Sequence, residues 1–139
     1  MPSIFLAEDN AADVELFRMA LAEADVDCEL SVFEDGLQII KFVRGLQQTG
    51  TSAMPDLIIL DLNLPKIDGL EVVQTLRQLS AFQGVPIVVM SSSSSLRDRE
   101  KLADCNIAAY IVKAPDLDEY MKIGQTIRKL LNDTPEPRL

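Results

Sequence analysis

The chain alternates short apolar runs with stretches of helical periodicity, and it does so five times. The runs that predict strands are Ser3–Ala7, Glu29–Phe33, Asp56–Leu60, Pro86–Met90 and Ala108–Val112. The third and fourth are rich in isoleucine, leucine and valine, as expected for strands that are covered on both faces. Strands separated by helices are joined by crossover connections, and these produce a parallel sheet with helices on both faces. The sequence therefore predicts an α/β fold.

Apolar stripes at helical spacing fill the intervals between these strands. In chain order they are Val14, Phe17, Leu21 and Ala24; Ile39, Ile40, Val43 and Leu46; Val72, Val73, Leu76 and Leu79; and Leu117, Tyr120, Met121, Gly124, Ile127 and Leu131. A weakly amphipathic fourth helix is predicted at about Leu96–Asp104. Asp116 followed by Glu119 indicates the start of the last helix. Right-handed crossovers then favour a doubly wound five-stranded parallel sheet of flavodoxin-like order 2-1-3-4-5.

Length and charge limit the functions that the chain can carry. The 139 residues predict one domain, which we place at residues 1–132, followed by a tail at 133–139 that frays. The formal net charge of −9 disfavours binding to nucleic acid or to an anionic membrane surface. The sequence has no apolar stretch long enough to span a membrane and no signal-peptide pattern. We therefore expect a cytoplasmic protein.

The chain contains no histidine. This absence excludes Ser-His-Asp and Cys-His catalysis and zinc sites with histidine ligands. The two cysteines, Cys28 and Cys105, lie far apart in the sequence. We expect both to be free thiols, with Cys105 exposed on a helix.

Four of the predicted strands end in groups that suit phosphoryl chemistry. Glu8 and Asp9 follow the first strand, Asp61 the third, Ser91 the fourth and Lys113 the fifth. In a doubly wound sheet, ligands bind outside the carboxyl ends of the strands, so these groups should meet. Neighbouring carboxylates repel one another unless a cation neutralises them, and Mg2+ prefers such oxygen ligands. The pattern favours a metal-assisted phosphoryl-acceptor site.

Other interpretations of the acids are available. Asp9 or Asn10 could simply cap the first helix. A phosphatase with an aspartyl nucleophile would need a second acid two residues after Asp61, where the chain has Asn63. A flavin-phosphate site would need a glycine- and hydroxyl-rich loop after the first strand, and the acidic Glu8-Asp9-Asn10 segment would instead repel the phosphate.

These segments together resemble the receiver domain of two-component response regulators. They are Glu8-Asp9-Asn10, the run from Asp61 to Gly69, Ser91 after an Ile-Val-Val-Met strand, and Lys113 after Tyr-Ile-Val. The resemblance covers about Ser3–Asn132. The Glu-Asp-Asn-x-x-Asp opening and the Asp-Leu-Asn-Leu-Pro segment are most similar to small stand-alone receivers of the phytochrome-partner type.

The resemblance implies a phosphorylatable signalling switch. Asp61 would accept a phosphoryl group from the phosphohistidine of a histidine kinase. Mg2+ would be bound by the Asp9 and Asp61 side chains and the Asn63 carbonyl, with Glu8 assisting through a water molecule. A receiver catalyses only its own phosphotransfer and autodephosphorylation, so the protein is not expected to be an enzyme in the usual sense.

The resemblance also implies how the signal leaves the site. Ser91 would hydrogen-bond a phosphoryl oxygen, Lys113 would pair with the phosphoryl group, and Tyr110 would turn inward as Ser91 moves. A half-buried strand tyrosine without a switching role is the plain alternative. We interpret Ser91–Ser95 as a flexible loop, with Ser95 as a helix cap.

One position departs from the family pattern. Receivers normally have proline after the strand-five lysine, whereas here Lys113 is followed by Ala114 and the proline is displaced to Pro115. A cis bond costs about 2.5–4 kcal/mol before alanine and about 0.5–1 kcal/mol before proline. We therefore expect a trans Lys113–Ala114 bond, and a cis bond at Ala114–Pro115 if one exists. The aim of Lys113 stays open, and phosphorylation would survive while its coupling to the fourth helix and the fifth strand is altered. This departure favours the alternative of a pseudo-receiver, a binding module with altered or absent phosphorylation switching.

Few residues follow the last predicted helix, so we expect output through protein–protein contact. The predicted surface comprises the fourth helix, the fifth strand and the fifth helix, and it would serve a downstream partner and homodimerisation. Leu102, Ile107 and Tyr120 are its candidate residues, with a core or solvated position as the alternative for each.

Overall fold

The computed structural model of the protein describes residues 1–49, 54–92 and 96–133. Within these ranges the elements are β1 (Ser3–Ala7), α1 (Ala11–Glu23), β2 (Glu29–Phe33), α2 (Gly36–Thr49), β3 (Leu57–Asp61), α3 (Gly69–Gln78), η1 (Ser80–Phe82), β4 (Ile87–Ser91), α4 (Leu96–Lys101), η2 (Ala103–Cys105), β5 (Ala109–Val112) and α5 (Leu117–Asp133), where η marks a 3-10 helix. The strands form one parallel sheet in the order β2-β1-β3-β4-β5. The predicted fold class and topology are confirmed.

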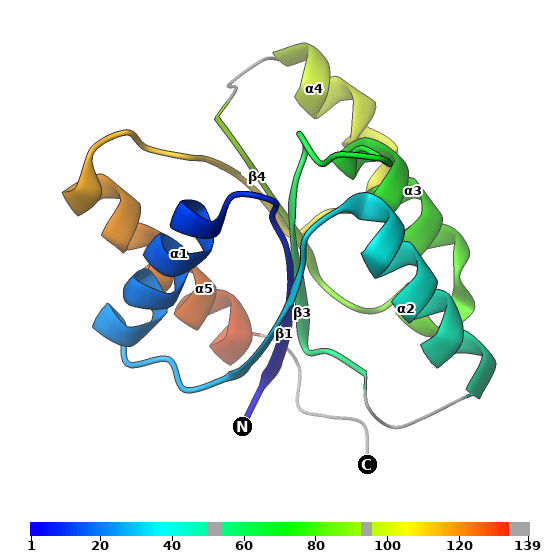
Figure 1. Ribbon diagram of the computed structural model, residues 1–139, viewed down its shortest axis with the longest axis horizontal. Helices are drawn as coiled ribbons and strands as arrows, with labels where there is room; N and C mark the ends of the chain where they lie inside the picture. Colours follow the sequence, from blue (N-terminus) through cyan, green and yellow to red (C-terminus); the bar gives the residue numbers. More distant parts are fainter. Residues whose placement is uncertain (50–53, 93–95, 134–139) are drawn as a thin grey trace.

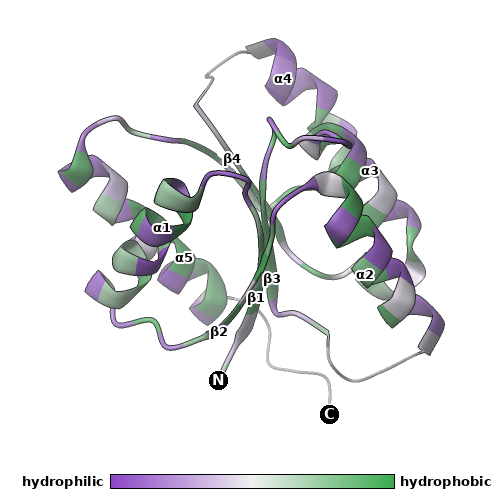
Figure 2. Cartoon of the chain, viewed as in Figure 1, coloured by the Kyte–Doolittle hydropathy of each residue, from purple (hydrophilic) through white to green (hydrophobic). Residues whose placement is uncertain are grey.

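Helices cover both faces of the sheet (Figure 1). α1 and α5 pack together on one face, and α2, α3 and α4 lie on the other. Successive residues of a strand point to opposite faces, so β1 contributes to two cores. Ile4 and Leu6 pack on the α1–α5 side, whereas Phe5 and Ala7 pack on the α2–α3 side. The hydropathy colouring shows the apolar strands lying between these two helical layers (Figure 2).

The predicted helical stripes are largely buried. Phe17 and Leu21 of α1, Val43 of α2 and Leu76 of α3 have almost no exposed surface. The exception is Leu117, the first residue of α5, whose side chain is 51% exposed. Leu117 lies on the same stripe as the buried residues of α5, but the first turn of this helix projects beyond the core.

Two strands end one residue later than predicted, and this shift places the site residues. Asp61 and Ser91 are the last residues of β3 and β4 rather than the residues that follow them. Asp61 pairs with Met90 across the sheet, and Ser91 pairs with Val112. Both side chains are consequently fixed by ladder geometry as well as by the loops that begin after them.

The segment between β4 and β5 differs from the prediction. The expected helix at Leu96–Asp104 is split into α4, which ends at Lys101, and the short η2 helix. Leu102 and Cys105 are buried against the core under α3. The predictions of a surface role for Leu102 and of an exposed Cys105 were therefore wrong. A stretch of six helical residues is too short for its periodicity to reveal which side chains face inward.

Tyr120 is also a core residue rather than a surface residue. It is 3% exposed and packs between α1 and α5, and its hydroxyl donates a hydrogen bond to the Asp13 carbonyl at 3.4 Å. Burial raises the pKa of Tyr120 to about 12. Ile107 is half-buried, so of the three proposed surface residues it alone retains partial exposure.

Arg77 holds together several segments at the end of the sheet opposite the predicted site. Its guanidinium donates to the backbone carbonyls of Phe82, Gln83 and Val85 at 2.9, 3.2 and 3.0 Å. It also donates to the carbonyls of Cys105 and Asn106 at 2.8 and 3.1 Å. One half-buried side chain on α3 thus satisfies the backbone on both sides of β4.

The two thiols should be poorly reactive in the folded protein. Burial raises the pKa of both Cys28 and Cys105, so less of each is present as the reactive thiolate. At about pH 8 we expect slow alkylation by iodoacetamide, with half-buried Cys28 labelled before buried Cys105, and rapid labelling of both after denaturation. Peptide mass spectrometry measures the alkylation rate of each cysteine. Equal alkylation rates for Cys105 in native and denatured protein would contradict its burial.

Three predictions fall wholly or largely outside the described residues: the helix cap at Ser95, the flexible loop at Ser91–Ser95 and the frayed tail at 133–139. Of these segments, Ser91 is the last residue of β4 and Asp133 the last residue of α5. Among the helices that are described, none combines the length and the apolar character needed to cross a membrane.

Candidate functional site

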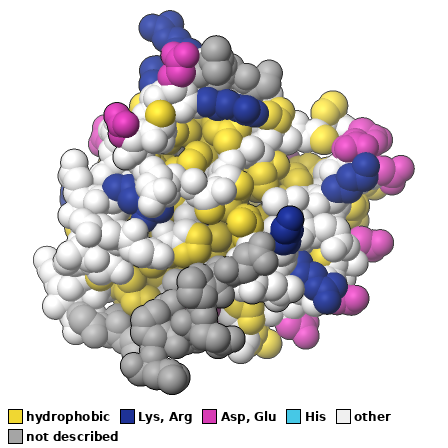
Figure 3. All heavy atoms as spheres, turned by 180° about the vertical axis from the view of Figure 1, so that it is seen from behind, with side chains coloured by type: hydrophobic (Ala, Val, Ile, Leu, Met, Phe, Trp, Pro, Cys, Tyr) yellow, Lys and Arg dark blue, Asp and Glu magenta, His cyan; other side chains and the backbone are white. Residues whose placement is uncertain are grey.

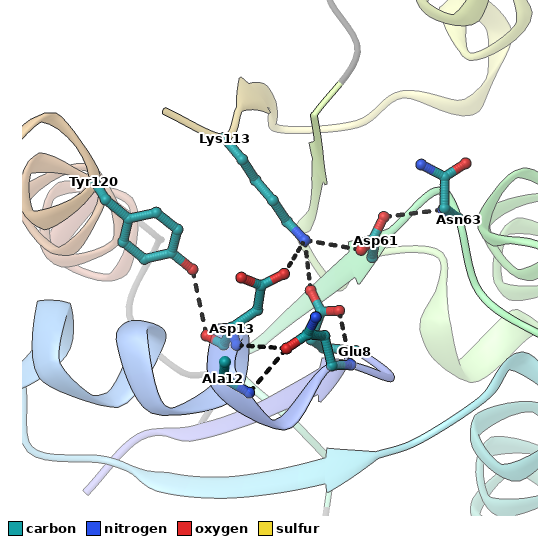
Figure 4. A network of polar contacts seen from close by, with 8 residues as sticks. Glu8, Ala12, Asp13, Asp61, Asn63, Lys113 and Tyr120 are labelled. Carbon is teal, nitrogen blue, oxygen red and sulfur yellow. Dashed lines mark hydrogen bonds and ion pairs between the residues drawn. The ribbon is translucent and has the colours of Figure 1, made fainter. Parts of the chain in front are cut away.

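The carboxyl ends of the strands meet where the sequence analysis expected. Ala7 of β1 pairs with Leu60 of β3. Glu8 and Asp61 follow these two residues, so they lie beside each other at the carboxyl ends of the two strands. The Lys113 backbone N–H donates to the Ser91 carbonyl at 2.8 Å, which continues the β4–β5 ladder by one residue. Figure 4 shows Glu8, Asp61 and Lys113 pointing toward one another from β1, β3 and the end of β5.

The first helix has its own cap, and this frees the two acids that precede it. Asn10 is the N-cap of α1, and its Oδ1 accepts hydrogen bonds from the backbone N–H groups of Ala12 and Asp13 at 2.9 and 3.2 Å. Glu8 instead turns into the site and is 5% exposed, while Asp9 is exposed. Of the alternatives, Asn10 is the cap and Asp9 is not.

Glu8, Asp9 and Asp61 form an acidic cluster. One oxygen from each carboxylate lies within 4.8 Å of the other two. Asp61 is 7% exposed, and its Oδ1 accepts a hydrogen bond from the Asn63 backbone N–H at 2.9 Å, which holds the start of the next loop beside the cluster. An all-oxygen, partly exposed donor set of this kind fits Mg2+, which retains several water ligands.

Lys113 lies at the centre of the carboxylates. Its Nζ contacts Glu8 Oε1 at 2.6 Å, Asp61 Oδ2 at 2.8 Å and Asp13 Oδ2 at 3.1 Å. An ammonium group has three N–H donors, so each one has a carboxylate partner. The side chain is only 12% exposed. This arrangement neutralises part of the negative charge that the strand ends bring together.

The aim of Lys113, which the sequence left open because Ala114 follows it, is direct. The described residues contain no cis peptide bond, which confirms the trans Lys113–Ala114 bond and rejects a cis bond at Ala114–Pro115. Lys113 nevertheless reaches Asp61 directly. Alanine at position 114 is therefore compatible with the usual orientation of this amine.

Burial and charge perturb the ionisation of the site. Burial raises the pKa of Glu8 to about 7, although its hydrogen bond with Lys113 acts in the opposite direction. Burial alone would lower the pKa of Lys113, but hydrogen bonds with Asp61 and Glu8 outweigh it and raise that pKa above its usual value. Lys113 is therefore charged at neutral pH, and in the absence of a cation Glu8 is partly protonated.

A profile of the family described as "Response regulator receiver domain" matches residues 4–124. The chain belongs to this family. It is 33% identical over 131 residues to "Response regulator Rcp1" of Synechocystis sp., a match that covers 94% of this chain and 89% of the relative. It is 28% identical to the "Polar-differentiation response regulator DivK" of Brucella anthropi, over 94% of this chain and 97% of the relative.

Solved structures of response regulators are also similar to this receiver domain. The phosphorylated cyanobacterial phytochrome response regulator RcpA is 34% identical with a TM-score of 0.84, over 96% of this chain and 95% of that one. The Mn2+-bound form of response regulator Rcp1 is 31% identical with a TM-score of 0.83, over 100% of this chain and 99% of that one.

Asp13 is the residue of the receiver site that sequence reasoning missed. It belonged to the quoted Glu-Asp-Asn-x-x-Asp opening, but no role was inferred for it. Its side chain reaches Lys113 from the first turn of α1 (Figure 4). The sequence placed Asp13 in the first turn of the helix that follows the Glu8-Asp9 pair, but the contact with Lys113, 100 residues away, leaves no local pattern.

The loop after Asp61 is fixed by two close backbone contacts. A Cβ at Gly69 would lie 2.3 Å from the Asp61 carbonyl oxygen, and a Cβ at Gly36 would lie 1.8 Å from the Ile67 carbonyl oxygen. Only glycine permits these approaches. Asp68 caps α3 by accepting a hydrogen bond from the Glu71 backbone N–H at 3.0 Å. The loop that carries Asn63 is therefore wedged between the starts of α2 and α3.

Asp35 adds a polar contact to this wedge. Its Oδ1 caps α2 by accepting from the Gln38 backbone N–H at 2.8 Å, and its Oδ2 lies 3.4 Å from Lys66 Nζ in the loop. The hydrogen bond from Gln38 and the Lys66 charge hold the pKa of Asp35 below its usual value. Asp35-Gly36 and Asp68-Gly69 thus stand at the starts of α2 and α3.

The predicted switch residues occupy connected positions. Ser91 is 1% exposed at the end of β4, adjacent to Asp61 along the sheet edge. Tyr110 is half-buried on β5, and the Arg99 guanidinium of α4 lies 4.8 Å from its ring centroid. This cation–π contact joins α4 to β5.

A pocket of about 490 Å³ opens beside the acidic cluster. It lies between the loop after Asp61 and α4, and its lining includes Asp9, Asn63, Pro65, Asp98 and Lys101. The pocket gives the exposed side of the cluster an approach from solvent.

Proposed function

We propose that this receiver domain is a signalling switch that accepts a phosphoryl group on Asp61 from the phosphohistidine of a histidine kinase. The observation that carries the proposal is the position of the Asp61 carboxylate, which lies between the acidic cluster and the Lys113 ammonium. The similarity to RcpA, whose structure is that of the phosphorylated protein, supports the same assignment.

The proposed reaction is a transfer between a ring nitrogen and a carboxylate. An Asp61 oxygen attacks phosphorus, the N–P bond breaks, and its electron pair returns to the imidazole nitrogen, which then takes a proton. The product is an acyl phosphate on Asp61. Two contacts orient the carboxylate: the Asn63 backbone N–H on Oδ1 and Lys113 on Oδ2. Positioning and charge stabilisation are the main contributions that a protein makes to such transfers.

Mg2+ is the proposed cofactor. The Asp9 and Asp61 side chains and the Asn63 carbonyl would hold it, and Glu8 would assist through a water molecule. When bound, the ion neutralises charge on the transferring phosphoryl group. The carboxylate cluster supports this set, as does the Mn2+-bound structure of the similar Rcp1.

The switch would run from Ser91 to Tyr110. After transfer, Lys113 would pair with the phosphoryl group and the Ser91 hydroxyl would hydrogen-bond one of its oxygens. Displacement of Ser91 would let Tyr110 turn inward, and this rotation would break its contact with Arg99. The position of α4 would then depend on the state of Asp61.

We further propose that the signal leaves through the α4–β5–α5 face, to a downstream partner and by homodimerisation. β5 is an edge strand, and Val112 at its end and Leu117 at the start of α5 are 36% and 51% exposed. Seen from behind, hydrophobic side chains form a band down the middle of the molecule, with charged side chains along much of its margin (Figure 3). Bands of this kind are typical of protein interfaces.

We do not propose a pseudo-receiver. The feature that favoured this alternative was the Ala114 departure, and the Lys113 amine contacts Asp61 at 2.8 Å in its presence.

The test is phosphorylation by acetyl phosphate and Mg2+, followed by intact mass spectrometry and peptide mapping. We expect a mass increase of one phosphoryl group located on Asp61, and no increase in chelator. Asp61→Asn should give no adduct, and Asp104→Asn, an exposed acid on η2, should behave like the wild type. A wild-type protein that stays unmodified under both acetyl phosphate and a panel of phosphorylated kinases would refute the proposal.

A further inference from the structure

The three carboxylates that share the Lys113 ammonium are not equivalent. Glu8 and Asp61 also belong to the acidic cluster of the proposed Mg2+ site, whereas Asp13 does not. Asp13 approaches Nζ from α1 at 3.1 Å. Glu8 and Asp61 would therefore contact both the ammonium and a bound cation, whereas Asp13 would contact the ammonium alone.

Mg2+ binding changes the balance of charge around Lys113. The ion would attract the same Glu8 and Asp61 carboxylates that hold the ammonium, and it would repel the ammonium directly, because like charges at short range are costly outside bulk water. Asp13 then becomes the remaining full negative charge that opposes expulsion of the amine.

We propose that Asp13 is a positioning residue that keeps the Lys113 ammonium beside Asp61 while Mg2+ is bound. The inference rests on the metal-binding part of the proposed function. It gives the first helix a role in the site that is separate from the acids preceding it.

The placement of Asp13 suits this role. Its backbone N–H is held by the Asn10 cap at 3.2 Å, and its carbonyl accepts the buried Tyr120 hydroxyl at 3.4 Å. The backbone of Asp13 is therefore held at its N–H by the start of α1 and at its carbonyl by α5. Its side chain is 29% exposed, so its charge is only partly screened by solvent.

The direct test observes the Lys113 side chain rather than phosphorylation. In protein labelled with 15N-lysine, an ammonium held in a buried ion pair exchanges slowly enough to give an NMR signal, which Lys113→Arg would assign. We expect the wild-type signal both in chelator and at saturating Mg2+. Asp13→Asn should keep the signal in chelator, because Glu8 and Asp61 still hold the amine, and should lose it when Mg2+ is added.

Glu15→Gln is the matched control. It removes one negative charge from the same helix, but Glu15 is exposed and contacts Arg18 at 3.8 Å rather than Lys113. It should behave like the wild type. We also expect Asp13→Asn, compared with Glu15→Gln, to bind beryllofluoride with Mg2+ roughly fivefold more weakly, the order expected for one part-exposed charged hydrogen bond. Beryllofluoride imitates the phosphoryl group on a carboxylate.

Retention of the Lys113 signal in Asp13→Asn with Mg2+ would overturn the inference, as would its loss in the wild type. If Asp13→Asn does not give a native amide spectrum, Asp13→Ser replaces it. Failure of the proposed metal site gives a different result, because the wild-type amide signals near Asp9 and Asp61 would then not respond to Mg2+ at all. That outcome would overturn the inference together with the metal site.

Discussion

Lys113→Met should destabilise the metal-free protein by about 3 kcal/mol, because removing one partner of a buried ion pair leaves uncompensated charge. Three carboxylates contact the Lys113 ammonium, and two of them, Glu8 and Asp61, are buried. Mg2+ should restore much of this loss, and should therefore stabilise the variant more than the wild type. Urea unfolding in chelator and in Mg2+ measures both effects.

The pH dependence in chelator gives a second readout. The pKa of Glu8 is about 7 in the folded protein, above the 4.5 of an unperturbed glutamate. The folded state therefore binds the proton more tightly than the unfolded state, and the contribution of Glu8 to stability falls as pH rises from about 4.5 through 7. Without Lys113 the pKa of Glu8 should rise further, so in the variant the loss of stability should continue to higher pH.

Lys122→Met is the control for these measurements. Lys122 contacts Glu119 at 2.9 Å, but its side chain is 70% exposed, and exposed pairs contribute little. Equal destabilisation by the two substitutions, or an absence of extra Mg2+ stabilisation in Lys113→Met, would show that the ammonium does not balance the acidic cluster.

Arg77→Met should cost about 3 kcal/mol, since it leaves several part-buried carbonyls without their charged donor. The guanidinium joins α3 to the segments on both sides of β4 through five backbone carbonyls. We expect amide hydrogen exchange to accelerate around Val85 and Cys105 and to stay unchanged at the strand ends that carry the site. Thermal unfolding gives the size of the loss.

Arg77→Lys should recover little of this stability, because an ammonium lacks the planar set of donors that reaches several carbonyls at once. Arg128→Met removes a single hydrogen bond, to the Ala24 carbonyl at 3.2 Å, and should cost much less. A loss in Arg77→Met no larger than that in Arg128→Met would refute the role of Arg77.

The periodic features of the fold were predictable from sequence. Apolar runs such as Ile87–Met90 identify strands covered on both faces, and the alternation with helices determines the parallel topology. That topology also predicts that the side chains at the carboxyl ends of the strands lie close together. They are Glu8, Asp61, Ser91 and Lys113. The predicted ends of β3 and β4 were one residue too early. Asp61 and Ser91 are polar, so the apolar pattern stops before them, but both residues still pair with the neighbouring strand.

Contacts between distant side chains were not predictable in this way. Asp13 and Lys113 are 100 residues apart, and Arg77 reaches Asn106, so neither contact leaves a local pattern. Leu102 and Tyr120 looked like surface residues because each helix was considered alone, and packing against its neighbours decided their burial. The effect of Ala114 could not be judged from local sequence for the same reason, because contacts with distant carboxylates fix the position of the Lys113 amine.

The junction of α1 with the end of β5 and the start of α5 has a consequence for protein synthesis. Asp61 emerges from the ribosome well before Lys113 and Tyr120, and domains are made from the N-terminus onward. A nascent chain that stops before β5 would carry the acidic cluster without its ammonium and without the partner helix of α1. Unfinished chains should therefore not hold Asp61 in its final surroundings.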